Sequence, residues 1–122
     1  MRINEKGTNM QITGEIKNYL YKKLEHLEKF IDPTYESVLC DVELGKISRH
    51  HKNGDVFRTE INLHIAGNNL RAEAEKDELF SSIDVAKDEM VRELKANKDK
   101  KVSQLKQGGA KIKKLVKEDS DK

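Results

Sequence analysis

The chain has 122 residues, of which 38% are charged and 35% hydrophobic, and its formal net charge is +2. This length supports a single domain with a modest core. No apolar run approaches the length of a membrane span or of a signal-peptide core, and the lone cysteine excludes an internal disulfide. We therefore expect a cytoplasmic protein.

The charge is unevenly distributed. Residues 1–94 hold 14 Lys and Arg against 18 Asp and Glu, whereas residues 95–122 hold 10 Lys against 4 acids, which gives −4 and +6. This asymmetry predicts a domain over residues 1–106 and a basic tail over 107–122. The tail has few apolar residues, so we expect it to be disordered in isolation.

The first elements are a short strand and an amphipathic helix. Residues 2–6 with 10–12 predict one short strand. A helix then follows, with Thr13 as its N-cap and with apolar residues every three or four positions: Ile16, Leu20, Leu24, Leu27 and Ile31. Asp32-Pro33 should end it, because proline lacks an amide hydrogen and restricts its predecessor.

Three strands follow. Residues 38–44 and 57–65 alternate between apolar and polar, and Cys40 falls among the apolar positions as a small core residue. Asn53-Gly54 is typical of the turn of a hairpin between them. Gly67-Asn68-Asn69 predicts a second tight turn before the strand that starts at Leu70.

The last element is a long helix. Its apolar positions are Leu79, Phe80, Ile83, Ala86, Met90 and Leu94, and Gln107-Gly108-Gly109 should end it. The order is β-α-β-β-β-α, an α+β domain in which both helices pack on one face of a four-stranded sheet. This order resembles a double-stranded-RNA-binding domain with an added first strand.

Two segments carry a family resemblance. The residues AEAE, then Phe80, then SSIDVAKDEMVRELKANK, together with IKNYLYKKLEHLEKFID at 16–32, are similar to the ribosome hibernation-promoting factors, also called ribosome-associated inhibitor A. The resemblance covers about residues 1–101. It implies a short-form protein without a second, C-terminal domain.

The resemblance also implies a function. Such a protein binds the small ribosomal subunit or the whole ribosome between head and body, and blocks the sites of messenger and transfer RNA under stress or in stationary phase. It needs no catalysis, cofactor, metal, membrane or small-molecule substrate, and we expect the free protein to be a monomer. The basic tail could follow the messenger channel.

The candidate ribosomal-RNA-binding residues lie mainly on the two helices. The resemblance implies Lys22, Lys23, Lys29, Arg71, Lys76, Arg92, Lys95 and Lys98. Helical spacing adds Lys87, eleven residues before Lys98, and Lys101 near the same line. Such cations position a protein on phosphates without reading sequence. Phe80 stands where the family usually has tyrosine, and Glu89 where lysine is common, which makes the second helix less basic.

Other classes of function stay open to different degrees. His50, His51, His64 and Cys40 lack the spacing of metal ligands, and no glycine-rich phosphate loop is present, so we expect no enzyme. One alternative is a general double-stranded-RNA-binding module. Another is a protein-interaction domain that uses the exposed sheet face, with Arg58, Glu60, Asn62 and His64.

Overall fold

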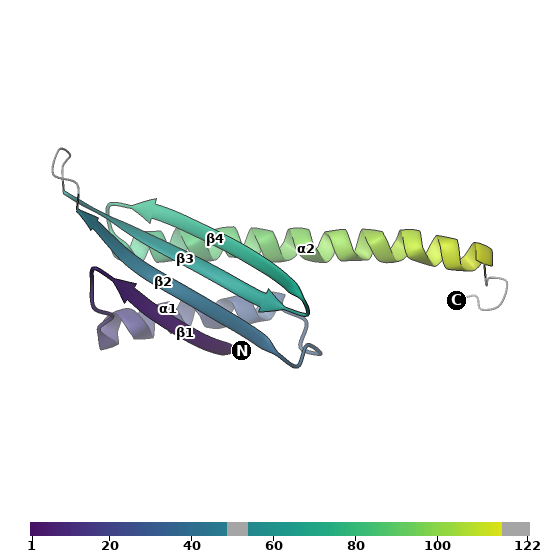
Figure 1. Cartoon of the computed structure of the whole chain (residues 1–122), viewed down its shortest axis with the longest axis horizontal. Helices are drawn as coiled ribbons and strands as arrows, with labels where there is room; N and C mark the ends of the chain where they lie inside the picture. The colour runs from purple at the N-terminus through teal and green to yellow at the C-terminus, as the bar shows by residue number, and fades with distance from the viewer. Residues whose placement is uncertain (49–53, 116–122) are drawn as a thin grey trace.

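The structure, a computed structural model, describes the backbone of residues 1–48 and 54–115 and the side chains of 1–48 and 54–98. Its elements are β1 (Arg2–Thr8), α1 (Gly14–Leu27), the 3-10 helix η1 (Glu28–Phe30), β2 (Val38–Ser48), β3 (Asp55–Ile65), β4 (Asn68–Lys76) and α2 (Leu79–Leu115). The predicted β-α-β-β-β-α order and the α+β class are confirmed (Figure 1).

The four strands form one sheet in the order β1-β2-β3-β4. β1 pairs with β2 in parallel, and the other pairs are antiparallel. The register aligns rows of side chains that face the helices, for example Ile3, Cys40, Leu63 and Leu70. The next row begins with Glu5 instead of an apolar residue, so the edge strand β1 contributes a polar group to this face.

Both helices cover the same face of the sheet. Leu20, Leu24 and Leu27 of α1 and Ile83 and Met90 of α2 have no exposed surface, because their helical spacing places them on the side that faces the strands. Cys40 is also fully buried among them, as predicted, and this burial raises its pKa to about 12.

The start of α1 follows the sequence prediction. The Thr13 hydroxyl accepts a hydrogen bond from the amide of Ile16 at 3.3 Å, which satisfies one free donor of the first turn. The α-helix ends at Leu27 and is followed directly by the 3-10 helix η1, which ends at Phe30, before Pro33. The opening strand, predicted over residues 2–6 with 10–12, is β1 and runs from Arg2 to Thr8. Residues 10–12 belong to the loop that follows it.

The predicted end of α2 is wrong. We expected the helix to stop at Gln107-Gly108-Gly109, but it continues to Leu115. Glycine lowers helix propensity by about 1 kcal/mol, yet it keeps its amide hydrogen and does not block the helix as proline would. With 37 residues, α2 is about 55 Å long and extends beyond the sheet (Figure 1). A separate tail over 107–122 stays a prediction.

The turn between β3 and β4 lies one residue earlier than expected. Its central residues are Ala66 and Gly67, with φ of 48° and 82°, and Asn68 and Asn69 already belong to β4. Positive φ at both positions is the requirement of a type I′ turn. The other predicted hairpin turn, with His50, His51 and Asn53, lies outside the described residues.

Candidate nucleic-acid interface

The two helices run in the same direction and meet along a line that we call the helix seam. On one side, the seam is formed by Tyr19, Lys23 and His26 of α1 and by Phe30 of η1. On the other side, it is formed by Phe80, Asp84, Lys87 and Lys95 of α2. Contacts cross the seam in order from Tyr19–Phe80 to Phe30–Lys95. Both sides of the seam therefore contribute aromatic rings and cations.

At the beginning of the seam, two aromatic rings border a hollow. The Tyr19 and Phe80 ring centroids are 4.5 Å apart at an interplanar angle of 65°, an edge-to-face pair. The hollow has a volume of about 440 Å³ and is also lined by Glu15, Asn18 and Lys22. Pockets that hold small organic groups start at about this size.

One turn further, Asp84 joins both helices. Its Oδ1 accepts a hydrogen bond from the Tyr19 hydroxyl at 2.6 Å and lies 3.2 Å from Lys23 Nζ, which itself sits 5.2 Å from the centre of the Tyr19 ring. Hydrogen bonding to Asp84 raises the pKa of both Tyr19 and Lys23. Lys23 is therefore a paired cation with a half-buried side chain.

The last part of the seam gathers positive charge around His26. Desolvation and then the charges of Lys87 and Lys29 lower the pKa of this imidazole. The His26 ring lies 5.6 Å from the Phe30 ring, and Lys95 Nζ lies 5.4 Å from the centre of the same Phe30 ring. Lysines from both sides of the seam thus lie on one surface. The spacing of residues within each helix alone does not predict this arrangement.

The predicted cations on the helices fall into two groups. Lys23, Lys87 and Arg92 each have a carboxylate partner on α2: Asp84 at 3.2 Å, Asp88 at 2.9 Å and Glu89 at 2.5 Å. The other four predicted cations of the helices with described side chains are exposed lysines that have no acidic partner within ion-pair distance among the described residues: Lys22, Lys29, Lys95 and Lys98. We call these four the unpaired lysines.

Two predicted residues lie away from the seam, and one cannot be placed. Lys76 is the last residue of β4, at the end where α2 begins, and is exposed. Lys101 belongs to α2, but its side chain lies outside the described residues. Arg71 lies on the opposite face of the molecule, with the solvent-facing side chains of the sheet.

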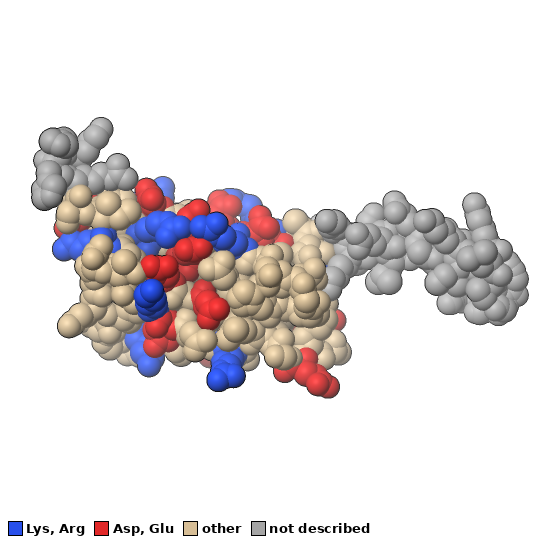
Figure 2. All heavy atoms as spheres, in the orientation of Figure 1, with Lys and Arg blue, Asp and Glu red and all other residues tan. Residues whose placement is uncertain are grey.

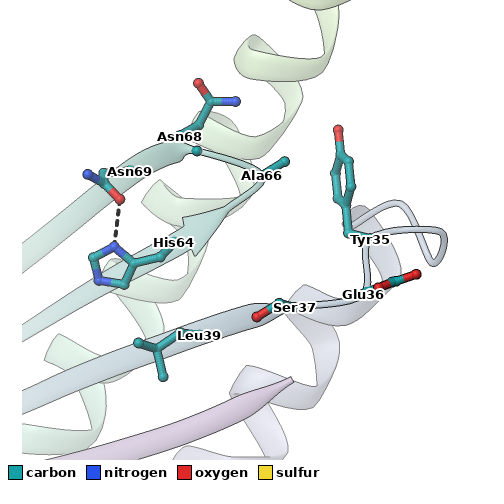
Figure 3. Close-up of a pocket in the computed structure, with 9 residues that line it drawn as sticks. Tyr35, Glu36, Ser37, Leu39, His64, Ala66, Asn68 and Asn69 are labelled. Atoms are coloured by element: carbon teal, nitrogen blue, oxygen red, sulfur yellow. Dashed lines mark hydrogen bonds between the residues drawn. The ribbon is translucent and has the colours of Figure 1, made fainter.

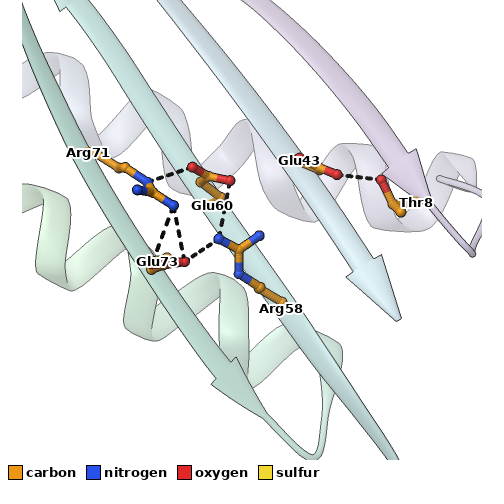
Figure 4. A network of polar contacts seen from close by, with 6 residues as sticks. All are labelled: Thr8, Glu43, Arg58, Glu60, Arg71 and Glu73. Carbon is orange, nitrogen blue, oxygen red and sulfur yellow. Dashed lines mark hydrogen bonds and ion pairs between the residues drawn. The ribbon is translucent and has the colours of Figure 1, made fainter. Parts of the chain in front are cut away.

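On the open sheet face, Lys and Arg side chains lie beside Asp and Glu side chains (Figure 2). Arg71 Nε lies 2.6 Å from Glu60 and its terminal nitrogen 3.4 Å from Glu73, while Arg58 pairs with the same two glutamates (Figure 4). The hydrogen bond from Arg58 lowers the pKa of Glu73. Because its guanidinium is already shared between two carboxylates, Arg71 is poorly placed to add to the cations of the helix seam.

A second hollow, of about 620 Å³, lies beside the β3–β4 turn (Figure 3). His64 Nδ1 lies 2.6 Å from Asn69 Oδ1 at its edge, and its Nε2 lies 3.3 Å from Asp41. The described residues that line this hollow include Glu36 but neither Lys nor Arg. It therefore does not extend the cationic surface. No group of three or more potential metal ligands occurs among the described residues.

Sequence reasoning missed three members of the seam: Tyr19, Phe30 and Asp84. A signal for them was present, because Tyr19, Lys23 and His26 have the same spacing as Phe80, Asp84 and Lys87. Parallel helices with this spacing can bring these residues together. The sequence, however, does not specify how far the two helices are shifted along their axes relative to each other.

The fold and the seam define a class of protein: a small α+β domain that keeps a self-paired polar sheet on one side and presents cations and aromatic rings from its helix pair on the other. Within this class, the model of the family described as sigma 54 modulation protein / S30EA ribosomal protein matches residues 3–102. The chain belongs to this family, as its sequence resemblance predicted.

Relatives of known name are ribosome hibernation factors. The chain is 28% identical over 84 residues to the ribosome hibernation promoting factor of Klebsiella oxytoca, a match that covers 69% of the chain and 79% of the relative. It is 27% identical over 86 residues to the ribosome hibernation promotion factor of Bacillus subtilis, which covers 70% of the chain but only 42% of that longer relative.

Two solved structures have a similar fold. The N-terminal domain of Thermus thermophilus Protein Y matches with a TM-score of 0.64 and 29% identity, over 79% of the chain and 98% of that domain. A ribosomal subunit interface protein from Coxiella burnetii matches with a TM-score of 0.65 over 81% of the chain and 99% of its own. At 19% identity, the second likeness concerns the fold alone. Among the described residues, no helix is long and apolar enough to cross a membrane.

Proposed function

We propose that this protein is a ribosome hibernation factor that binds the small ribosomal subunit, alone or within the whole ribosome. The observation that carries the proposal is the family match over residues 3–102, together with relatives named as hibernation factors. As in our sequence-based expectation, the domain would lie between head and body and exclude messenger and transfer RNA under stress or in stationary phase.

The helix seam supports a mechanism without catalysis. The unpaired lysines would contact ribosomal RNA phosphates and release their counterions, which favours binding and makes it salt-dependent. Inhibition would follow from occupation of the messenger and transfer RNA sites. The basic residues after 106 would add further charge along the messenger channel, and the protein would act as a monomer in the cytoplasm.

Co-sedimentation with ribosomes and with isolated subunits at low and high salt tests this proposal, with duplex RNA as a competitor. We expect stoichiometric binding to the small subunit that salt weakens and duplex RNA does not displace. Displacement by duplex RNA would favour a general duplex-binding module instead. No ribosome binding at low salt would overturn the proposal.

A matched pair of triple variants locates the interface. Replacing Lys22, Lys29 and Lys95 with Ala should reduce the negative log–log salt slope by about 2 to 3, because three phosphate contacts are lost. Arg2 and Lys6 are exposed residues of β1 on the open sheet face. Replacing them and Arg71 with Ala removes the same charge from this face and should leave the slope unchanged. The reverse result would place the interface on the sheet.

A further inference from the structure

We propose that the hollow bordered by Tyr19 and Phe80 holds one unstacked RNA base, with the adjoining phosphate on Lys22. This inference rests on the proposed function and adds to it. Phosphate contacts alone would make the seam a purely electrostatic surface, whereas a base pocket makes part of the affinity independent of salt. It also selects for unpaired nucleotides.

The walls of the hollow suit the face of a base. Phe80 and Tyr19 form an edge-to-face pair at 4.5 Å, and both are half-buried, so each ring keeps surface that solvent can reach. The Tyr19 hydroxyl is fixed by Asp84 at 2.6 Å, and Lys23 lies over its ring at 5.2 Å. The rings are therefore held in place before a ligand arrives, and binding loses little side-chain entropy.

The polar groups of the hollow distinguish a base from a phosphate. The Glu15 carboxylate would repel a phosphate inside the hollow, but it can accept hydrogen bonds from the amino group of a base. The Asn18 amide can donate and accept beside it. Lys22, one of the unpaired lysines, lines the same hollow and would hold the phosphate at its border.

A paired base cannot enter this hollow. In a duplex both faces of a base are stacked and its hydrogen-bonding edge is used, so only a base that is turned out of a loop or a bulge can reach the rings. Ribosomal RNA with its many unpaired nucleotides fits this requirement, and free duplex RNA does not. The same feature explains how the seam could discriminate against duplex competitors.

The test measures binding to small ribosomal subunits purified from Bacillus subtilis at several salt concentrations. Phe80→Leu keeps an apolar side chain but loses the aromatic face, and should weaken binding about tenfold with an unchanged log–log salt slope. Phe80→Tyr should bind like the unaltered protein. Phe57→Leu is the matched control, because Phe57 is a half-buried aromatic residue on β3, outside the hollow. Lys22→Ala should reduce the negative slope by about 0.7 to 0.9.

Each result decides between the two proposals. Equal affinity of Phe80→Leu and the unaltered protein would overturn the base pocket and leave the ribosome-binding function standing. Absence of binding by the unaltered protein would overturn both. If thermal melting shows that Phe80→Leu is unfolded, Asn18→Leu decides instead: it fills the hollow from an exposed position, and the base pocket requires it to weaken binding without a change of slope.

Discussion

At the residue scale, two tyrosines hold α1 from opposite sides. Tyr19 donates to Asp84 of α2, and Tyr21 donates to Glu5 Oε1 of β1 at 2.7 Å. Lys17 lies 3.4 Å from Glu5 and 5.5 Å from the centre of the Tyr21 ring, which repeats the arrangement of Lys23 at the seam. The hydrogen bond to Glu5 raises the pKa of Tyr21 to about 12 and lowers that of Glu5.

The lowered pKa of Glu5 predicts a contribution to acid stability. The unfolded chain binds the proton more tightly than the folded protein, so the contribution of Glu5 is fully present above its ordinary pKa of 4.5 and is lost as the pH falls through the lowered folded value. In urea unfolding at pH 6 and pH 3, Glu5→Gln should lose less unfolding free energy on acidification than the unaltered protein. Glu25→Gln, an exposed control on α1, should follow the unaltered protein; an identical loss in all three would contradict the prediction.

Ala66 adopts a conformation that disfavours alanine. Its φ of 48° is in the left-handed region, which costs a residue with a Cβ atom about 1 to 2 kcal/mol, and which asparagine tolerates better. Ala66→Asn gives the Asn-Gly pair preferred in type I′ turns and should stabilise the protein by about 0.5 to 1 kcal/mol. Thermal unfolding would measure this as a higher Tm. Ala96→Asn, on the exposed part of α2, should instead lower stability by about 0.5 kcal/mol.

At the element scale, the carboxylates of α2 determine how much positive charge of the helix pair is available. Asp84 forms an ion pair with Lys23 of α1. Within α2, Asp88 pairs with Lys87 and Glu89 pairs with Arg92. The carboxylates of α2 therefore limit the electrostatic attraction of the seam.

Asp84→Asn should release Lys23. The exposed ion pair is worth no more than about 1 kcal/mol, and the amide can still accept the Tyr19 hydrogen bond, so the fold should be retained. We expect binding to small subunits to become several times tighter, with a salt slope steeper by about 0.7 to 0.9. Glu25→Gln makes the same change of net charge on α1 and should not steepen the slope. An unchanged slope for Asp84→Asn would show that Lys23 does not reach phosphate.

The continuation of α2 through Gly108 and Gly109 is also testable. Each glycine costs about 1 kcal/mol of helix propensity relative to alanine. Replacing both with Ala should raise the helical circular dichroism signal at 222 nm with little effect on Tm, because the projecting segment lies beyond the sheet. Gly108→Pro should lower that signal. If both variants gave the signal of the unaltered protein, the helix would not extend to Leu115 in solution.

At the scale of the whole molecule, the two faces have different electrostatic roles. On the sheet face, arginines and glutamates neutralise one another, while the helix side carries the unpaired lysines. With four phosphate contacts, the log–log salt slope for binding to ribosomes should be about −3. Nine contacts, one for each predicted cation with a described side chain, would give about −7. Titration at five or more potassium concentrations separates the two values.

The amino-acid sequence by itself determined the order of the elements, the buried stripes of both helices, the Thr13 cap and the family. These features depend on residues a few positions apart, so periodicity and turn chemistry are sufficient to predict them. The tertiary structure decided which cations are free. Tyr19 and Asp84 are 65 residues apart, and Arg71 meets Glu60 only through the strand register. Pairing between distant segments depends on how the helices and strands are aligned, and no local pattern specifies that alignment.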